Sequence, residues 1–178
     1  LTAAGIGLPA HPDMKPNISL VIGDPAGIGP ELVVKLLADA TVRRANVYLI
    51  GSRAVLADAM QATGIRHDLP VLAQQDIGKG DLPAPVLVDW PGLDAGGFAR
   101  GQASADNGQF MLAMLTLGAR LTQTGATDAL CFAPLNKGAL RAGGMRQQDE
   151  LRWFEDLLGC HGYTGELNVL DTLWTSRV

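Results

Sequence analysis

Apolar residues along the chain recur with two alternating periods, one typical of buried strands and the other of amphipathic helices. Short runs rich in aliphatic and β-branched residues predict strands at 18–22, 47–50, 86–88 and 129–133. Apolar residues spaced by three or four predict helices between them. The longest helix carries the stripe Phe110, Met114, Leu117 and Leu121, and Ser104 is its predicted N-cap. Strands that alternate with helices indicate an α/β protein with a mostly parallel sheet and flanking helices.

The first predicted strand runs into a glycine-rich loop, 23–31, which reads Gly-Asp-Pro-Ala-Gly-Ile-Gly-Pro-Glu and opens a helix. Free N–H groups at a helix start suit a phosphate or a carboxylate. The loop lacks the Gly-Lys-Ser/Thr of a Walker A sequence, and Leu32 stands where the dinucleotide fingerprint has a glycine. The loop is therefore either a tight βα connection or an anion site around Asp24, Gly27 and Gly29. Asp24 favours the site, because open α/β sheets bind ligands at the carboxyl ends of strands.

A second candidate site follows the strand predicted at 129–133, where the chain reads Ala-Pro-Leu-Asn-Lys-Gly. Lys137 offers a mobile cation, and Asn136 offers both donors and acceptors, so the pair could hold an anionic substrate. The alternative is a solvated lysine without a ligand. Loops that follow parallel strands converge at one edge of the sheet, so we expect both loops at the same edge.

The composition of the chain argues against some classes of partner. The 178 residues are 47% hydrophobic and carry a formal net charge of −4 without a basic stripe, which argues against a nucleic-acid partner. Residues 1–13 lack the charged start of a signal peptide, and no membrane partner is expected. Cys131 and Cys160 are predicted to be buried free thiols of a cytoplasmic protein. We interpret 1–16 as a tail and 17–178 as a partial α/β region that ends within an element.

The two loops together carry a resemblance to a known family. The stretches Ile18–Glu31 and Ala133–Lys137 resemble the 4-hydroxythreonine-4-phosphate dehydrogenase family, including its relatives that act on four-carbon sugar-acid phosphates. The resemblance implies the N-terminal part of a two-domain fold like that of isocitrate and isopropylmalate dehydrogenases, with a cleft completed by a homodimer partner. It also implies oxidation of a phosphorylated hydroxy acid by NAD or NADP, decarboxylation of the oxo product, and a divalent zinc, magnesium or cobalt ion.

The sequence departs from the family in two places. Where the family has Gly-His-Thr-Glu, this chain has Gln147-Gln148-Asp149-Glu150, so Gln148 and Asp149 take the positions of the substrate-contacting His and Thr. Asp149 would disfavour an anionic group, and its alternative role is simply to begin a helix. The family binds its metal through histidines, but His11, His67 and His161 have no partner at metal-ligand spacing. We therefore expect the metal ligands of the intact enzyme to lie outside this chain.

Three hypotheses remain open from the sequence. The first is the N-terminal portion of a metal- and NAD(P)-dependent dehydrogenase, inactive by itself. The second is a short non-catalytic homologue that binds an anionic ligand or a partner. The third is an unrelated α/β protein whose glycine loops are structural, in which case the two loops would lie apart.

Overall fold

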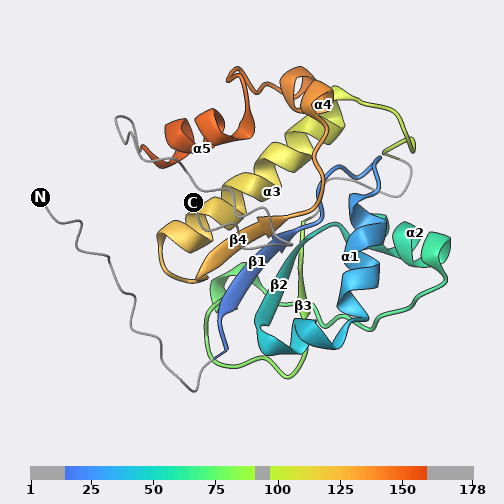
Figure 1. Ribbon diagram of the computed structural model, residues 1–178, viewed down its shortest axis with the longest axis vertical. Helices are drawn as coiled ribbons and strands as arrows, with labels where there is room; N and C mark the ends of the chain where they lie inside the picture. Colours follow the sequence, from blue (N-terminus) through green and yellow to red (C-terminus); the bar gives the residue numbers. More distant parts are fainter. Residues whose placement is uncertain (1–14, 91–96, 160–178) are drawn as a thin grey trace, which may run out of the picture.

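Four parallel strands and five α-helices make up the part of the chain that the computed structural model describes, residues 15–90 and 97–159 (Figure 1). In chain order they are β1 (Asn17–Val21), α1 (Gly29–Leu37), β2 (Asn46–Gly51), α2 (Arg53–Thr63), β3 (Val86–Asp89), α3 (Ala105–Gln123), β4 (Ala129–Phe132), α4 (Lys137–Ala142) and α5 (Glu150–Leu158). Two 3-10 helices, Ala40–Arg44 and Gln74–Asp76, lie in the connections. The predicted α/β class with a parallel sheet is confirmed.

The order of the strands across the sheet is β3-β2-β1-β4, and every neighbouring pair is parallel. Leu20 of β1 lies beside Leu49 of β2 on one side and beside Cys131 of β4 on the other. The chain therefore builds the sheet outward from β1 to β3 and then returns through α3 to place β4 on the opposite side of β1. The direction in which successive strands are added to the sheet reverses between β1 and β4. Ligands of open α/β sheets bind at such a switch point.

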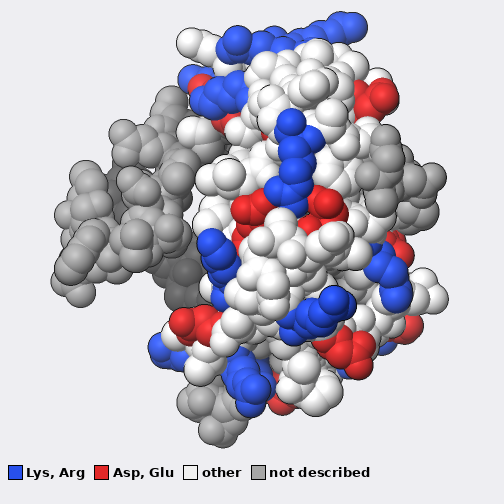
Figure 2. Space-filling view, turned by 90° about the vertical axis from the view of Figure 1, so that its right-hand side faces the viewer, with Lys and Arg blue, Asp and Glu red and all other residues white. Residues whose placement is uncertain are grey.

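Helices cover both faces of the sheet (Figure 1). α1 and α2 pack against each other on one face, whereas α3 lies on the other with α4 and α5 against it. The sheet and these helices share one large core, whose fully buried side chains include Ile22, Leu49, Ile50, Leu56, Met114 and Leu115. On the face that Figure 2 shows, acidic and basic side chains are interspersed among uncharged surface. No helix in the described ranges has the length and apolarity needed to span a membrane.

Local capping explains where most helices begin. Ser52, Ser104 and Asp149 accept hydrogen bonds from the backbone N–H groups of Ala54, Asn107 and Arg152, at 3.2, 3.1 and 3.0 Å. Ser104 was predicted to cap the longest helix, and this is confirmed. The alternative role of Asp149 as the start of a helix is confirmed as well. Gly64 and Gly159 end α2 and α5 in the left-handed conformation that favours glycine, with φ of 70° and 68°.

The strand predicted to be buried at 129–133 is β4, and it is only partly buried. Among residues 15–90 and 97–159 it pairs with β1 alone, whereas β2 has a neighbouring strand on each side, and the last two residues of β4 are exposed. Phe132 is 43% exposed, and Cys131 is an exposed free cysteine, so the prediction of a buried thiol at 131 is wrong. Partial desolvation still raises the pKa of the Cys131 thiol, which reduces its thiolate fraction at neutral pH. Cys160 lies outside the described residues.

α3 and α4 approach each other so closely that their contact requires glycine. A Cβ atom on Gly108 of α3 would lie 1.9 Å from the carbonyl oxygen of Ala139 in α4. A Cβ atom on Gly143, directly after α4, would lie 2.4 Å from the carbonyl carbon of Gly108. Met111, Leu140 and Met145 fill the space around this contact as a small separate cluster. The position of α4, and of the loop before it, therefore depends on backbone-to-backbone packing.

This contact predicts unequal effects of the same substitution at two glycines of α3. Gly108→Ala would push a methyl group into backbone that cannot rotate away, and we expect a loss of about 3 kcal/mol in the free energy of unfolding. At Gly118 a Cβ atom would meet the end of the Leu130 side chain at 2.6 Å, which can change rotamer. Gly118→Ala should be close to neutral, because the gain in helix propensity of about 1 kcal/mol offsets that adjustment. Urea unfolding of both variants measures the difference, and equal losses would contradict the proposed backbone contact.

Candidate functional site

The two loops predicted from the sequence meet at the carboxyl edge of the sheet. The N–H of Asp24, just after β1, donates to the carbonyl oxygen of Pro134, just after β4, at 3.0 Å. Gly23 has a φ of 77°, and a Cβ atom on it would lie 2.5 Å from the same carbonyl oxygen. The expectation that both loops lie at one edge is confirmed, and the alternative in which they lie apart is wrong. The meeting point is the switch point between β1 and β4.

Asp24 stabilises the first loop from inside. The residue is only 5% exposed, and its Oδ1 accepts a hydrogen bond from the N–H of Ala26 at 3.0 Å. Its carbonyl oxygen accepts from the N–H of Gly27 at 3.1 Å, so one residue closes two successive turns. A Cβ atom on Gly29 would lie 2.5 Å from the carbonyl oxygen of Ile22. Internal packing therefore accounts for Gly23 and Gly29 without any ligand.

The start of α1 nevertheless differs from the start of the other α-helices in the described ranges. Its N-cap, Ile28, makes no side-chain hydrogen bond to the helix, whereas the N-caps of α2, α3, α4 and α5 all do. Pro30 in the first turn removes one N–H that would need a partner. The remaining amides of the first turn can donate to an anion at the edge of the sheet. Gly27 and Gly29 lie beside them.

Asn136 and Lys137 open α4 on the other side of the switch point. The Oδ1 of Asn136 accepts from the N–H of Ala139 at 3.0 Å and so caps the helix, which leaves the side-chain amide nitrogen as its ligand donor. Lys137 is the first residue of α4, its side chain is 61% exposed, and its Nζ lies 3.6 Å from Glu150 Oε2. A cation at the first position of a helix opposes the helix dipole, so Lys137 does not serve the stability of α4.

Gln148 and Asp149 lie in the turn before α5. Gln148 is exposed, and its carbonyl oxygen accepts from Arg141 Nη2 at 3.4 Å. Asp149 uses Oδ1 as the cap of α5, as described above. The ion pair between Lys137 and Glu150 brings this turn to the second loop. The hydrogen bonds and ion pairs of the described residues do not join Gln148 or Asp149 to the loop of Asp24.

The ligands of the implied metal were sought among the described residues. Within 15–90 and 97–159, no three His, Cys, Asp or Glu side chains gather as a metal-binding group. His67 Nε2 lies 2.8 Å from the carbonyl oxygen of Val34, and His11 and His161 fall outside the described residues. Because internal contacts explain Gly23 and Gly29, these two glycines are not by themselves evidence of a nicotinamide site. The described residues therefore supply no complete ligand set for the metal, and we assign no catalytic step to the side chains of these residues.

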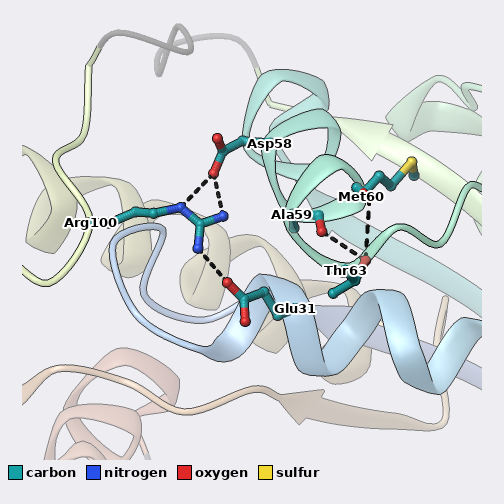
Figure 3. A network of polar contacts seen from close by, with 6 residues as sticks. All are labelled: Glu31, Asp58, Ala59, Met60, Thr63 and Arg100. Carbon is teal, nitrogen blue, oxygen red and sulfur yellow. Dashed lines mark hydrogen bonds and ion pairs between the residues drawn. The ribbon is translucent and has the colours of Figure 1, made fainter.

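Sequence reasoning missed a cluster of charges beside the first loop. Arg100 reaches Glu31 in the first turn of α1 and Asp58 in α2, so three segments of the chain meet at one guanidinium (Figure 3). The only signal in the sequence was an arginine in a glycine-rich stretch ahead of Ser104. Nothing in the spacing relates it to carboxylates 69 and 42 residues away.

Comparisons with known proteins agree on one family. The family model described as pyridoxal phosphate biosynthetic protein PdxA matches residues 43–178. A Pseudomonas aeruginosa protein, provisionally assigned as 4-hydroxythreonine-4-phosphate dehydrogenase 2, is 43% identical over 165 residues, which are 92% of this chain and 49% of that protein. A Symbiobacterium thermophilum protein, provisionally assigned as D-threonate 4-phosphate dehydrogenase, is 34% identical over 150 residues, 84% of this chain and 45% of that protein.

A solved structure supports the same fold. The crystal structure of a 4-hydroxythreonine-4-phosphate dehydrogenase from Burkholderia phymatum superimposes with a TM-score of 0.72 at 31% identity, over 83% of this chain and 44% of that one. The chain thus spans about half the length of the curated relatives it matches.

The hydrogen bond from the N–H of Ala26 to Asp24 Oδ1 predicts how the Asp24 side chain stabilises the loop. Asp24→Ala removes the acceptor for the N–H of Ala26 and should lower the free energy of unfolding by about 1–2 kcal/mol. Asp24→Asn keeps an oxygen in the same position and is the matched control, with an expected change within about 0.5 kcal/mol. Thermal and urea unfolding of both variants test this. If Asp24→Asn destabilises as much as Asp24→Ala, the negative charge rather than the hydrogen bond stabilises the loop.

Proposed function

The chain belongs to the family of the pyridoxal phosphate biosynthetic protein PdxA, and from that premise we propose that it supplies one half of a dehydrogenase for a phosphorylated hydroxy acid. The substrate would be 4-hydroxythreonine 4-phosphate or a related four-carbon acid such as D-threonate 4-phosphate, the compounds after which the relatives are named. NAD or NADP would accept the hydride as the secondary alcohol becomes a ketone and loses a proton. The C–C bond to the carboxyl group of the oxo acid would then break with release of carbon dioxide, and the enolate left behind would take up a proton from water.

The observation that carries the proposal is the hydrogen bond between Asp24 and Pro134 at the β1/β4 switch point. It holds the loop before α1, whose first turn has no side-chain cap, against the loop that leads to Lys137. Both the free amides of that turn and the lysine favour an anion. Backbone amides of the first turn of α1 would receive one anionic group of the substrate. Lys137 and the side-chain amide of Asn136 would hold a second group from the opposite side. Gln148 and Asp149 would lie at the outer edge of the site. There the carboxylate of Asp149 would repel a phosphate that is bound out of place.

The remaining parts of the enzyme would come from outside the described residues. The divalent metal of the resemblance needs a complete and deprotonated ligand set, and we place that set outside residues 15–90 and 97–159. A homodimer partner would complete the cleft. The alternative of a non-catalytic homologue keeps the same anion site without the redox step.

The assay that tests the function uses the product of the complete gene. Each of the two phosphorylated acids is mixed with NAD or NADP and a divalent metal, and formation of reduced nicotinamide is followed by absorbance. Turnover with either acid supports the proposal. Binding of the acid without turnover would support the non-catalytic alternative, and failure to bind either acid would contradict both.

Lys137→Ala tests the role of the second loop. We expect kcat/KM to fall at least about tenfold, because a charge-assisted contact to the substrate is lost. The free energy of unfolding should not fall by more than about 0.5 kcal/mol, because exposed ion pairs contribute little and the lysine opposes the helix dipole.

Lys79→Ala is the matched control for Lys137→Ala. It also removes an exposed lysine from an ion pair, here with Asp76 at 2.9 Å, but far from the two loops in the connection before β3. Its kcat/KM should remain unchanged. Equal kinetics for Lys137→Ala and the control would show that Lys137 does not contact the substrate.

A further inference from the structure

Arg100 lies between two carboxylates that belong to two different helices (Figure 3). Its Nε and Nη2 donate to Asp58 Oδ2 at 3.0 and 2.6 Å, and its Nη1 donates to Glu31 Oε1. Three of the donors in the guanidinium fork are therefore used, and they point in different directions within one plane. Arg100 thus joins the first turn of α1 to α2.

The backbone next to Arg100 contacts the first loop directly. The N–H of Gly101 donates to the carbonyl oxygen of Ala26 at 2.8 Å, and Gly101 has a φ of 74°, which turns the chain toward α3. On the other side, Asn107 Nδ2 donates to the carbonyl oxygen of Gln102 at 3.1 Å. Residues 100–102 are therefore tied to the loop of Asp24 at one end and to the first turn of α3 at the other.

The charges in this cluster matter for any anion that binds at the start of α1. Glu31 sits in the first turn of that helix, and Asp58 lies close enough to share the same guanidinium. The hydrogen bonds to Glu31 and to Asp58 raise the pKa of Arg100, so it remains a cation over the whole working range of pH. Without Arg100, the carboxylates of Glu31 and Asp58 would both lose their cation. Glu31, in the first turn of α1, would then repel a phosphate or carboxylate that approaches this helix start.

We propose that Arg100 is a positioning residue of the anion site. It holds the 100–102 segment against the loop of Asp24 and neutralises the two carboxylates beside that loop, so that the amides of α1 keep a fixed position and a favourable field for an anionic substrate. The contribution to substrate affinity rests on the proposed function, whereas the mechanical contact does not. Arg100 itself does not contact the substrate.

Hydrogen exchange of the protein without substrate tests the mechanical contact. Arg100→Ala should speed the exchange of the Gly101 and Ala26 amides by about fivefold, the size expected for a small network of partly exposed ion pairs. Arg100→Lys keeps the charge but lacks the planar fork, so its exchange should resemble that of Arg100→Ala. Lys79→Ala, which breaks an exposed ion pair elsewhere, should leave these amides unchanged. Unchanged exchange in Arg100→Ala would overturn the inference.

Kinetics of the complete enzyme test the electrostatic part. We expect Arg100→Ala to raise KM for the phosphorylated acid about tenfold while kcat changes less than about twofold, because only binding of the anion is affected. Arg100→Lys should retain much of the wild-type KM. Adding Glu31→Gln to Arg100→Ala should recover part of the lost affinity, because one of the two repelling charges is removed.

The outcomes separate the two proposals. If the wild-type enzyme turns over neither phosphorylated acid, the proposed function fails, and the exchange experiment still decides whether Arg100 holds the loop. If turnover is observed and Arg100→Ala changes exchange but not KM, the electrostatic role is overturned. A KM that Glu31→Gln fails to recover would show that Arg100 acts through geometry alone.

Discussion

The hydrogen bond from Asp24 to Pro134 is the contact on which the candidate site depends. It joins two loops that are far apart in the sequence, and it exists because β4 returns to lie beside β1 and not beside β3. Parallel pairing places the carboxyl ends of both strands at the same edge, so their loops must converge. The left-handed Gly23 lets the first loop approach the second without a steric clash.

A second constraint comes from α3 and α4. Their backbones are in contact at Gly108 and Gly143, and this contact determines the position of α4 along α3. It therefore also determines the position of Asn136 and Lys137 at the start of α4. Glycine at these positions serves a rigid contact and not flexibility, since a side chain there would push α4 away from α3. The position of the second loop therefore depends on how α4 packs against α3, on the opposite face of the sheet from α1.

Electrostatics complete the arrangement around these rigid parts. The start of α1 has no side-chain cap, Lys137 stands where it opposes a helix dipole, and Arg100 compensates two carboxylates next to the first loop. None of these features is favourable for stability in itself, because exposed ion pairs contribute little. Together they produce an edge of the sheet that can accept negative charge, which fits the phosphorylated acids proposed for this family.

The sequence by itself determined the α/β class, nearly every strand and helix, the cap at Ser104 and the two loops, because these depend on apolar periodicity and local hydrogen bonding. It also placed both loops at one edge, since parallel βα units leave no other choice. Tertiary structure alone decided that β4 is a half-exposed strand with an exposed Cys131. It alone brought Arg100 to Glu31 and Asp58, because such contacts arise when distant segments pack, and no local pattern records them.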